Sequence, residues 1–253
     1  MAERNKITDY LMQTFQPEKF HDSSLNGLQV TGSDEVTGIC LGVDACQDLF
    51  EAAVEKKFNY IVVHHGFFWG TPFAISPMWG KRYQTLLNNG LSLFAVHLPM
   101  DANPEIGHNI LISKHLGLDH LSPFGHYKGV PIGFHGRFTK PLPMAEVQLR
   151  LKKQFGDGIH LLPFGKDTIS KVGVVSGAAA TQEILDEAAR LGIDLFVTGE
   201  TDHTAFHTVK ELGLNVAFCG HYETEKTSLL TLKELLEERF NVPAEFIILP
   251  TGL

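Results

Sequence analysis

The sequence has few cysteines and little basic charge. With three cysteines in 253 residues there are too few for a disulfide framework, which indicates a reducing compartment and predicts small buried residues at Cys40, Cys46 and Cys219. The 21 Lys and Arg residues are outnumbered by 29 Asp and Glu residues, which gives a formal net charge of -8. This balance argues against a surface that neutralises many phosphates, so DNA is not a favoured partner.

Long hydrophobic runs and common catalytic motifs are also missing. The N-terminal segment MAERNKITDYLMQTF has no continuous apolar run of the secretory kind, and no later stretch reaches the roughly 20 apolar residues of a membrane helix. We therefore expect a cytoplasmic protein with no membrane partner. The chain has no phosphate-binding loop, no dinucleotide fingerprint, no G-x-S-x-G elbow and no paired C-x-x-C.

Apolar segments suited to buried strands alternate with helix-like segments in both parts of the chain. In the first part these strands are expected at 38–43, 60–65 and 91–97, and in the second part at 171–177, 194–200 and 214–220. A final helix at 226–240 and a last strand at 245–250 follow. The alternation predicts an α/β fold with mixed, largely parallel sheets.

The two parts share a pattern. When the first helix and second strand of each part are aligned with one gap, Ala52-Ala53 falls over Ala188-Ala189. Each third strand also ends in His-x-x-x-carboxylate, which favours an internal duplication over coincidence of α/β patterning. We expect two similar lobes that form one compact unit, at 1–125 and 126–253, with a connecting strand, helix and strand at about 126–170.

Titratable side chains gather where these strands end. Ligands of parallel α/β sheets bind beyond the carboxyl ends of the strands, and that edge is the expected place of His64, His65, His97, Asp101, Glu200 and His221. Glu225 is expected in the first turn of the final helix, with Thr224 as its N-cap. Gly66 would let the chain turn so that both members of the His pair reach one site.

Imidazoles and carboxylates without thiolates suit zinc, manganese, iron or nickel, and the ligand set does not choose among them. Each element alone has a more ordinary explanation. A His pair is more often capped or partly exposed, Asp101 could be a turn residue, and Glu225 could be only a first-turn acid. Their convergence on one sheet edge favours a metal site, with His64, His65, Asp101, His221 and Glu225 as the ligands.

Other histidines and an aromatic stripe carry less weight. His203 and His207 are spaced for one helix face, but the segment DHTAFH offers no third ligand. Surface or packing roles are expected for His108, His115, His120 and His126. The stripe after the His pair is expected to cover a cleft or a subunit interface, with base stacking as the sharper alternative; it consists of Phe67, Phe68, Trp69 and Phe73.

Six segments in order resemble the motifs of the GTP cyclohydrolase 1 type 2 homologs, also described as Nif-three-like dinuclear metal-centre proteins. The segments are NGLQV at 26–30, GVDA at 42–45, IVVHHGFFW at 61–69, HLPMDA at 97–102, VTGE at 197–200 and GHYETEK at 220–226. The resemblance covers essentially the whole chain. It implies a two-lobed α/β subunit, a toroidal homohexamer and two divalent metal ions per subunit, held by the five ligands named above with Glu225 as a bridge.

The resemblance leaves two classes of function open. The first is a metal-dependent hydrolase in which a metal-bound hydroxide opens a purine ring or a related C–N or phosphoester bond of a small molecule such as a nucleotide. His97 and Glu200 are then the candidates for proton transfer. The second is a non-enzymatic, ring-shaped metal-binding scaffold that interacts with DNA or protein. A phosphatase or nuclease that uses the same ions is a further form of the first class.

Overall fold

The chain folds into two compact units. The computed structural model describes residues 1–200 and 203–252. Unit 1 comprises residues 1–100 and 228–249, and unit 2 comprises residues 101–227 and the residues from 250 onward. Within the described residues, no helix is long and apolar enough to cross a membrane.

Unit 1 is built on a five-stranded sheet with the order β13-β4-β5-β6-β2. Its strands are β2 (Gly27–Val30), β4 (Ile39–Asp44), β5 (Tyr60–His65), β6 (Ser92–Ala95) and β13 (Ala244–Phe246). All neighbours are parallel except β2, which runs antiparallel to β6. A separate pair consists of β1 (Ala2–Glu3) and β3 (Glu35–Val36).

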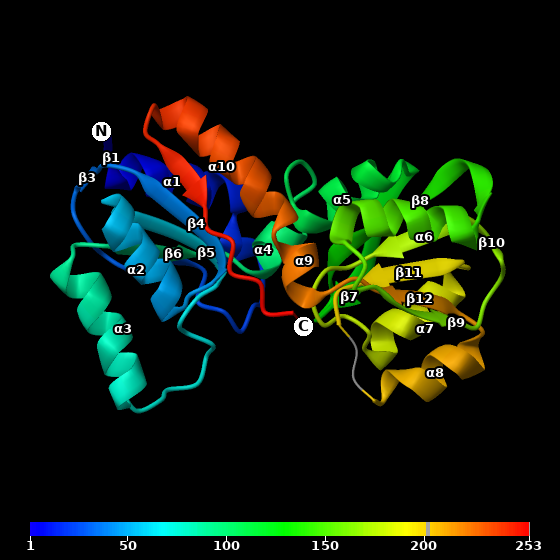
Figure 1. The fold of residues 1–253 in the computed structure, drawn as a ribbon. Helices are drawn as coiled ribbons and strands as arrows, with labels where there is room; N and C mark the ends of the chain where they lie inside the picture. Colours follow the sequence, from blue (N-terminus) through cyan, green and yellow to red (C-terminus); the bar gives the residue numbers. More distant parts are fainter. Residues whose placement is uncertain (201–202, 253) are drawn as a thin grey trace. The chain divides into compact units, whose positions relative to one another are not determined.

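Helices cover both faces of the unit 1 sheet (Figure 1). On one face lie α2 (Gln47–Lys56) and α3 (Pro77–Asn88), whose apolar side chains join the core formed by β4, β5 and β6. On the other lie α1 (Arg4–Phe15) and α10 (Thr227–Phe240). A turn of 3-10 helix, η1 (Pro17–Lys19), follows α1. Because the sheet is buried on both faces, its strands are almost entirely apolar in sequence.

Unit 2 is built on a six-stranded sheet with the order β7-β8-β10-β11-β12-β9. Its strands are β7 (Asp119–Tyr127), β8 (Val130–Pro143), β9 (His160–Pro163), β10 (Thr168–Val174), β11 (Leu195–Thr198) and β12 (Asn215–Phe218). The central three are parallel and the others antiparallel. Its helices are α5 (His108–Leu116), α6 (Met144–Phe155), α7 (Gln182–Arg190), α8 (Ala205–Leu212) and α9 (His221–Glu225).

The expected α/β class is confirmed, with sheets that are mixed and partly parallel. Each sheet contains three parallel strands in chain order, with an antiparallel strand beside the third. A short helix that ends on a carboxylate follows each third strand: α4 (Leu98–Asp101) follows β6, and α9 follows β12. The two units therefore share an arrangement, whereas descent by internal duplication stays a prediction.

The division of the chain differs from the boundary expected at residues 125 and 126. Residues 228–249 belong to unit 1 because β13 pairs with β4 near the start of the chain. Residues 101–125 belong to unit 2 because β7 forms a long antiparallel hairpin with β8. The connecting segment contains the expected strand, helix and strand as β8, α6 and β9, and it supplies edge strands of the unit 2 sheet.

A carboxylate ties β10 to β11 at the start of both strands. Asp194 directly precedes β11, and its Oδ2 accepts hydrogen bonds from the backbone N–H groups of Ser170 (3.0 Å) and Lys171 (2.9 Å). Its Oδ1 lies 2.9 Å from Nζ of Lys166. Burial opposes ionisation of Asp194, but these hydrogen bonds outweigh it and hold the pKa of the carboxyl below its usual value.

We predict that Asp194→Asn lowers the free energy of unfolding at pH 7 by about 1–2 kcal/mol, since hydrogen bonds to a charged group are lost. A depressed pKa contributes stability above the unfolded value near ~3.9, and this contribution is lost as the pH falls through the folded value. Urea unfolding at pH 7 and near pH 3 should therefore show a difference between wild type and variant that shrinks in acid. Asp157→Asn is the control because that carboxyl is exposed. A difference independent of pH would contradict the assignment.

Candidate metal centre

Three histidines gather at the carboxyl ends of β5 and β6 in unit 1. The ligand atoms of His64, His65 and His97 lie within 4.8 Å of one another. The ring centroids of His64 and His65 are 4.6 Å apart, and that of His97 lies 5.0 Å from the first and 5.6 Å from the second. The structure thus brings the His pair together with His97, as the strand-end argument predicted.

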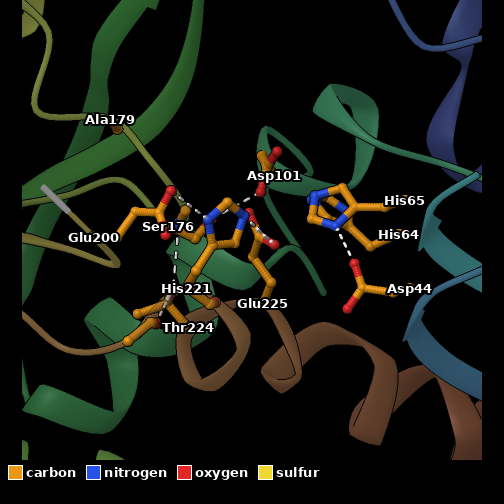
Figure 2. Close-up of polar contacts among 12 residues, drawn as sticks. Asp44, His64, His65, Asp101, Ser176, Ala179, Glu200, His221, Thr224 and Glu225 are labelled. Carbon is orange, nitrogen blue, oxygen red and sulfur yellow. Dashed lines mark hydrogen bonds and ion pairs between the residues drawn. The ribbon is translucent and has the colours of Figure 1, made fainter. Parts of the chain in front are cut away.

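The Nδ1 atom of each of these rings faces a fixed oxygen. His64 Nδ1 lies 3.0 Å from the backbone carbonyl of Val96. His65 Nδ1 lies 2.8 Å from Oδ1 of Asp44, the last residue of β4 (Figure 2). A carbonyl or carboxylate can only accept, so Nδ1 carries a hydrogen, and in the neutral ring Nε2 carries the lone pair. The same arrangement orients histidines that bind metals.

His97 is held by a loop that precedes β2. Its Nδ1 lies 3.0 and 3.1 Å from the two carboxylate oxygens of Asp22, and its backbone N–H donates to Oδ1 of Asn26 (2.7 Å). Asp22 also accepts from the side-chain amide of Asn26 and from the backbone N–H groups of Ser24 and Leu98, each at 3.0 Å. Burial raises the pKa of Asp22, but the contact with His97 and the other donors outweigh it and hold the pKa well below its usual value.

Gly66 is needed for space, since its φ is not positive. A Cβ at this position would collide with the side chain of Gln29 and with Cβ of Ala95. Oε1 of Gln29 accepts from the backbone N–H of Phe67 at 2.7 Å, which fixes the chain just after the His pair.

In unit 2, a second group of ligand atoms forms around His221. Its Nε2 lies 2.9 Å from Oε2 of Glu225, and its Nδ1 lies 3.3 Å from Oε1 of Glu200, so the ring lies between two carboxylates (Figure 2). Burial alone would lower the pKa of His221. The hydrogen bonds and charges of Glu225 and Glu200 reverse this and raise the pKa to about 9.

Glu225 is the last residue of α9, not a first-turn residue of the final helix, which begins at Thr227. The expected N-cap role of Thr224 is therefore also wrong. Its hydroxyl donates within α9, to the carbonyls of Gly220 (2.9 Å) and His221 (3.0 Å), and accepts from the backbone N–H of Gly177 (3.1 Å). The short helix places His221 and Glu225 one turn apart on the same face.

Asp101 is oriented by the loop that follows β10. The hydroxyl of Ser176 donates to Oδ1 of Asp101 at 2.8 Å (Figure 2), and the backbone N–H of Ser176 donates to Oδ1 of Asn109 at 2.7 Å. His108, fully buried at the start of α5, has a ligand atom within 4.8 Å of the Asp101 carboxylate. His108 therefore belongs to the candidate site, although a surface or packing role was expected for it.

Gly177 leaves the space that the Glu225 carboxylate occupies. Its φ is +67°, and a Cβ at this position would collide with Oε1 of Glu225. Any other residue would therefore be strained in its backbone and would displace a candidate ligand. The loop of Ser176 and Gly177 thus positions two carboxylates, Asp101 and Glu225.

Thiolates take no part in these groups. Cys40 and Cys219 are buried as expected, and Cys46 is partly buried. Burial raises the pKa of the Cys40 and Cys219 thiols to about 12, so both stay protonated at neutral pH. His203 precedes α8, which begins at Ala205, so His203 and His207 do not share a helix as expected. Asp202 of the same segment lies outside the described residues.

Sequence reasoning found the histidines and carboxylates but missed the groups that orient them. Asp44 could have been found, because it ends a parallel strand at the same edge as the His pair. Asp22 and Ser176 lie in loops, where neither spacing nor periodicity pointed to them. The assignment of His64, His65, Asp101, His221 and Glu225 to a single two-metal centre stays a prediction.

The model of one protein family, Duf34/NIF3 (NGG1p interacting factor 3), matches residues 2–251. The chain belongs to the DUF34/NIF3 family. Among its relatives are proteins named GTP cyclohydrolase 1 type 2 homolog. The one from Deinococcus radiodurans is 38% identical over 99% of this chain and 94% of its own length. The one from Archaeoglobus fulgidus is 39% identical over 98% of both chains.

Solved structures show the same NIF3 fold over the whole chain. The structure titled "protein ybgI, unknown function" matches with a TM-score of 0.91 at 31% identity, covering 99% of this chain and 100% of that one. The protein TTHA1606 from Thermus thermophilus matches with a TM-score of 0.86 at 37% identity, with the same coverage. The resemblance inferred from the sequence motifs is therefore confirmed at the level of family and fold.

We predict that Ser176→Ala weakens divalent metal binding by roughly 10–100-fold, because Asp101 loses the donor that fixes one of its oxygens. Isothermal titration of chelator-treated protein with Zn²⁺ or Mn²⁺ measures the effect. Ser113→Ala is the matched control, since the buried Ser113 hydroxyl donates only to the carbonyl of Asn109 within α5. Equal affinities for wild type and both variants would show that Ser176 does not position a ligand.

Proposed function

We propose that this NIF3-family chain is a metal-dependent hydrolase that binds two divalent ions through His64, His65, Asp101, His221 and Glu225. The observation that carries the proposal is the gathering of the unit 1 histidines: their ligand atoms lie within 4.8 Å of one another, and each Nδ1 faces an oxygen, so Nε2 is the nitrogen with which each ring would bind a cation. The carboxylates around His221 supply the negative charge that a cation needs.

The donor chemistry fits borderline divalent ions. The candidate ligands offer imidazole nitrogens and carboxylate oxygens, a set that suits zinc, manganese, iron or nickel. Asp101 and Glu225 are buried, and buried charged groups are normally paired or bind metals. Divalent ions at this site would supply Lewis acidity toward a carbonyl, ring carbon or phosphoryl group.

The reaction class rests on the relatives, whose printed name is GTP cyclohydrolase 1 type 2 homolog. We propose hydrolytic opening of a purine ring or cleavage of a related C–N or phosphoester bond. His97 is our candidate for proton transfer, since Asp22 fixes its Nδ1 and its ring centroid lies 5.0 Å from that of His64. The contact of Glu200 with His221 supports a role in orienting that ring, beside the proton-transfer role expected from the sequence.

We predict that Asp101→Asn and Glu225→Gln each lose at least one bound ion. The rate of hydrolysis should fall by a larger factor than the roughly 10–100-fold decrease that follows the loss of a group orienting a metal ligand. Metal content of protein purified without a tag is measured by plasma mass spectrometry, and activity against GTP, phosphoesters and small amides by chromatography. Glu211→Gln and Asp157→Asn are controls on exposed carboxylates.

The products separate the alternatives. A ring-opened purine supports the cyclohydrolase-like reaction, whereas free phosphate or a shortened oligonucleotide supports a phosphatase or nuclease on the same ions. If Asp101→Asn abolishes metal binding but leaves hydrolysis unchanged, the hydrolase proposal is lost. If metal-loaded wild type turns over none of these substrates, the non-enzymatic scaffold replaces it, in keeping with the family description of an interacting factor.

We also propose that the chain assembles into a toroidal homohexamer, a state that the motif resemblance implies. Light scattering after size-exclusion chromatography should then give about six times the chain mass of 28.0 kDa, with and without chelator. A mass near that of one chain at micromolar concentration would contradict the assembly. Hydrolysis measured on the same sample tests the site separately from the assembly.

A further inference from the structure

An open apolar groove lies beside the histidine cluster, entirely within unit 1. Its volume is about 430 Å³, which falls in the range of small-molecule sites. The side chains that form its walls come from the loop before β2, the loop after β5 and helix α3. We call it the aromatic groove; its walls are Leu25, Phe68, Trp69, Phe73, Ile75 and Tyr83.

The walls of the aromatic groove offer ring faces and no charge. Trp69 and Phe73 are each 38% exposed, so both present surface that a ligand could cover. The Phe73 ring is stacked on Phe68 (6.2 Å between centroids, 27° between planes), and it lies 4.5 Å from Trp79 at 35°. Burial raises the pKa of Tyr83, so its phenol stays neutral. A phosphate would find no cation among the lining residues.

Trp69 joins the aromatic groove to the histidines. Its ring centroid lies 5.0 Å from that of His97 and 5.7 Å from that of His65. Its Nε1 donates to the carbonyl of Gly66 at 3.1 Å, which restrains the ring. The backbone N–H of Leu25 donates to the carbonyl of Phe68 at 2.9 Å, so the loop that holds His97 through Asp22 also borders the groove.

We infer that the aromatic groove binds a flat, uncharged aromatic or heteroaromatic ring of the substrate, stacked on Trp69 and Phe73 next to His65 and His97. Offset stacking and burial of ring surface favour such an occupant over an aliphatic one of equal size. Any charged part of the substrate then lies outside the groove. The identification of this ring as part of a hydrolysed substrate rests on the proposed function. The binding of a ring in the groove is independent of it.

The test uses the full-length protein labelled with 5-fluorotryptophan. The chain has only two tryptophans, Trp69 and Trp79, and both contact the groove or its Phe73 wall, so fluorine NMR gives two signals that Trp79→Phe assigns. Purine riboside, a neutral heteroaromatic probe, is titrated with and without chelator. Ribose and cyclohexanol test whether the sugar or any apolar ring suffices. We expect a saturable shift of the Trp69 signal with purine riboside alone.

Phe73→Ala should weaken this binding by at least about fivefold, the loss typical of one base–aromatic stack. Phe206→Ala is the matched control, because Phe206 is 39% exposed on α8 in unit 2 and should leave binding unchanged. If Phe73→Ala does not fold, Ile75→Asp replaces it: Ile75 is 68% exposed, and a carboxylate there should weaken ring binding because the bound ring would cover an unpaired charge.

Three results would overturn the inference. The first two are the absence of a shift with purine riboside and an equal shift with cyclohexanol. The third is a Phe73→Ala variant with an altered oligomeric mass and an unchanged titration, a result that would make the groove a contact between subunits. Metal content is measured on the same samples. Normal metal binding and hydrolysis without ring binding would remove only this inference, whereas ring binding without any hydrolysis would remove only the proposed function.

Discussion

The candidate site depends on hydrogen bonds that fix one nitrogen of each strand-end histidine. A free imidazole ring can rotate and can exchange its hydrogen between two nitrogens, which would leave the direction of its lone pair undefined. In unit 1 the carbonyl of Val96 and the carboxylates of Asp44 and Asp22 remove both freedoms, since each accepts from one Nδ1. The proposed binding of a cation by these rings depends on the three acceptors.

In unit 2 the orientation of the carboxylates is fixed by different contacts. Asp101 has one oxygen fixed by the Ser176 hydroxyl, while Glu225 occupies space that exists only because residue 177 has no side chain. The short helix α9 then sets His221 and Glu225 on one face. Orientation is thus supplied by hydrogen-bond acceptors in one unit, and by a donor together with close packing in the other. The Ser176 and Gly177 loop follows the parallel strand β10, whereas in unit 1 Asp44 ends β4 and Asp22 lies in the loop before β2.

Most strands and the candidate ligands could be predicted from the sequence. Buried parallel strands are apolar runs in the sequence, and the polar residues that end them are easily recognised. The strands β4, β5, β6, β10, β11 and β12 were predicted on that basis, whereas the family was inferred from the resemblance of six motifs. What could not be predicted depends on contacts distant in sequence. The pairing of β13 with β4, the reach of Asp22 to His97 across 75 positions and the donor role of Ser176 leave no local pattern. The contacts of Gly177 with Thr224 and Glu225, residues 47 and 48 positions away, leave no local pattern either.

The return of the last helix and strand to unit 1 has a consequence for how the chain is made. Unit 2 is almost continuous in sequence, so its core can form while synthesis is still in progress. The sheet of unit 1 gains its edge strand β13 only after residue 246 has left the ribosome, and until then β4 presents an unpaired apolar edge. Unit 1 therefore completes its sheet only after β13 has been synthesised.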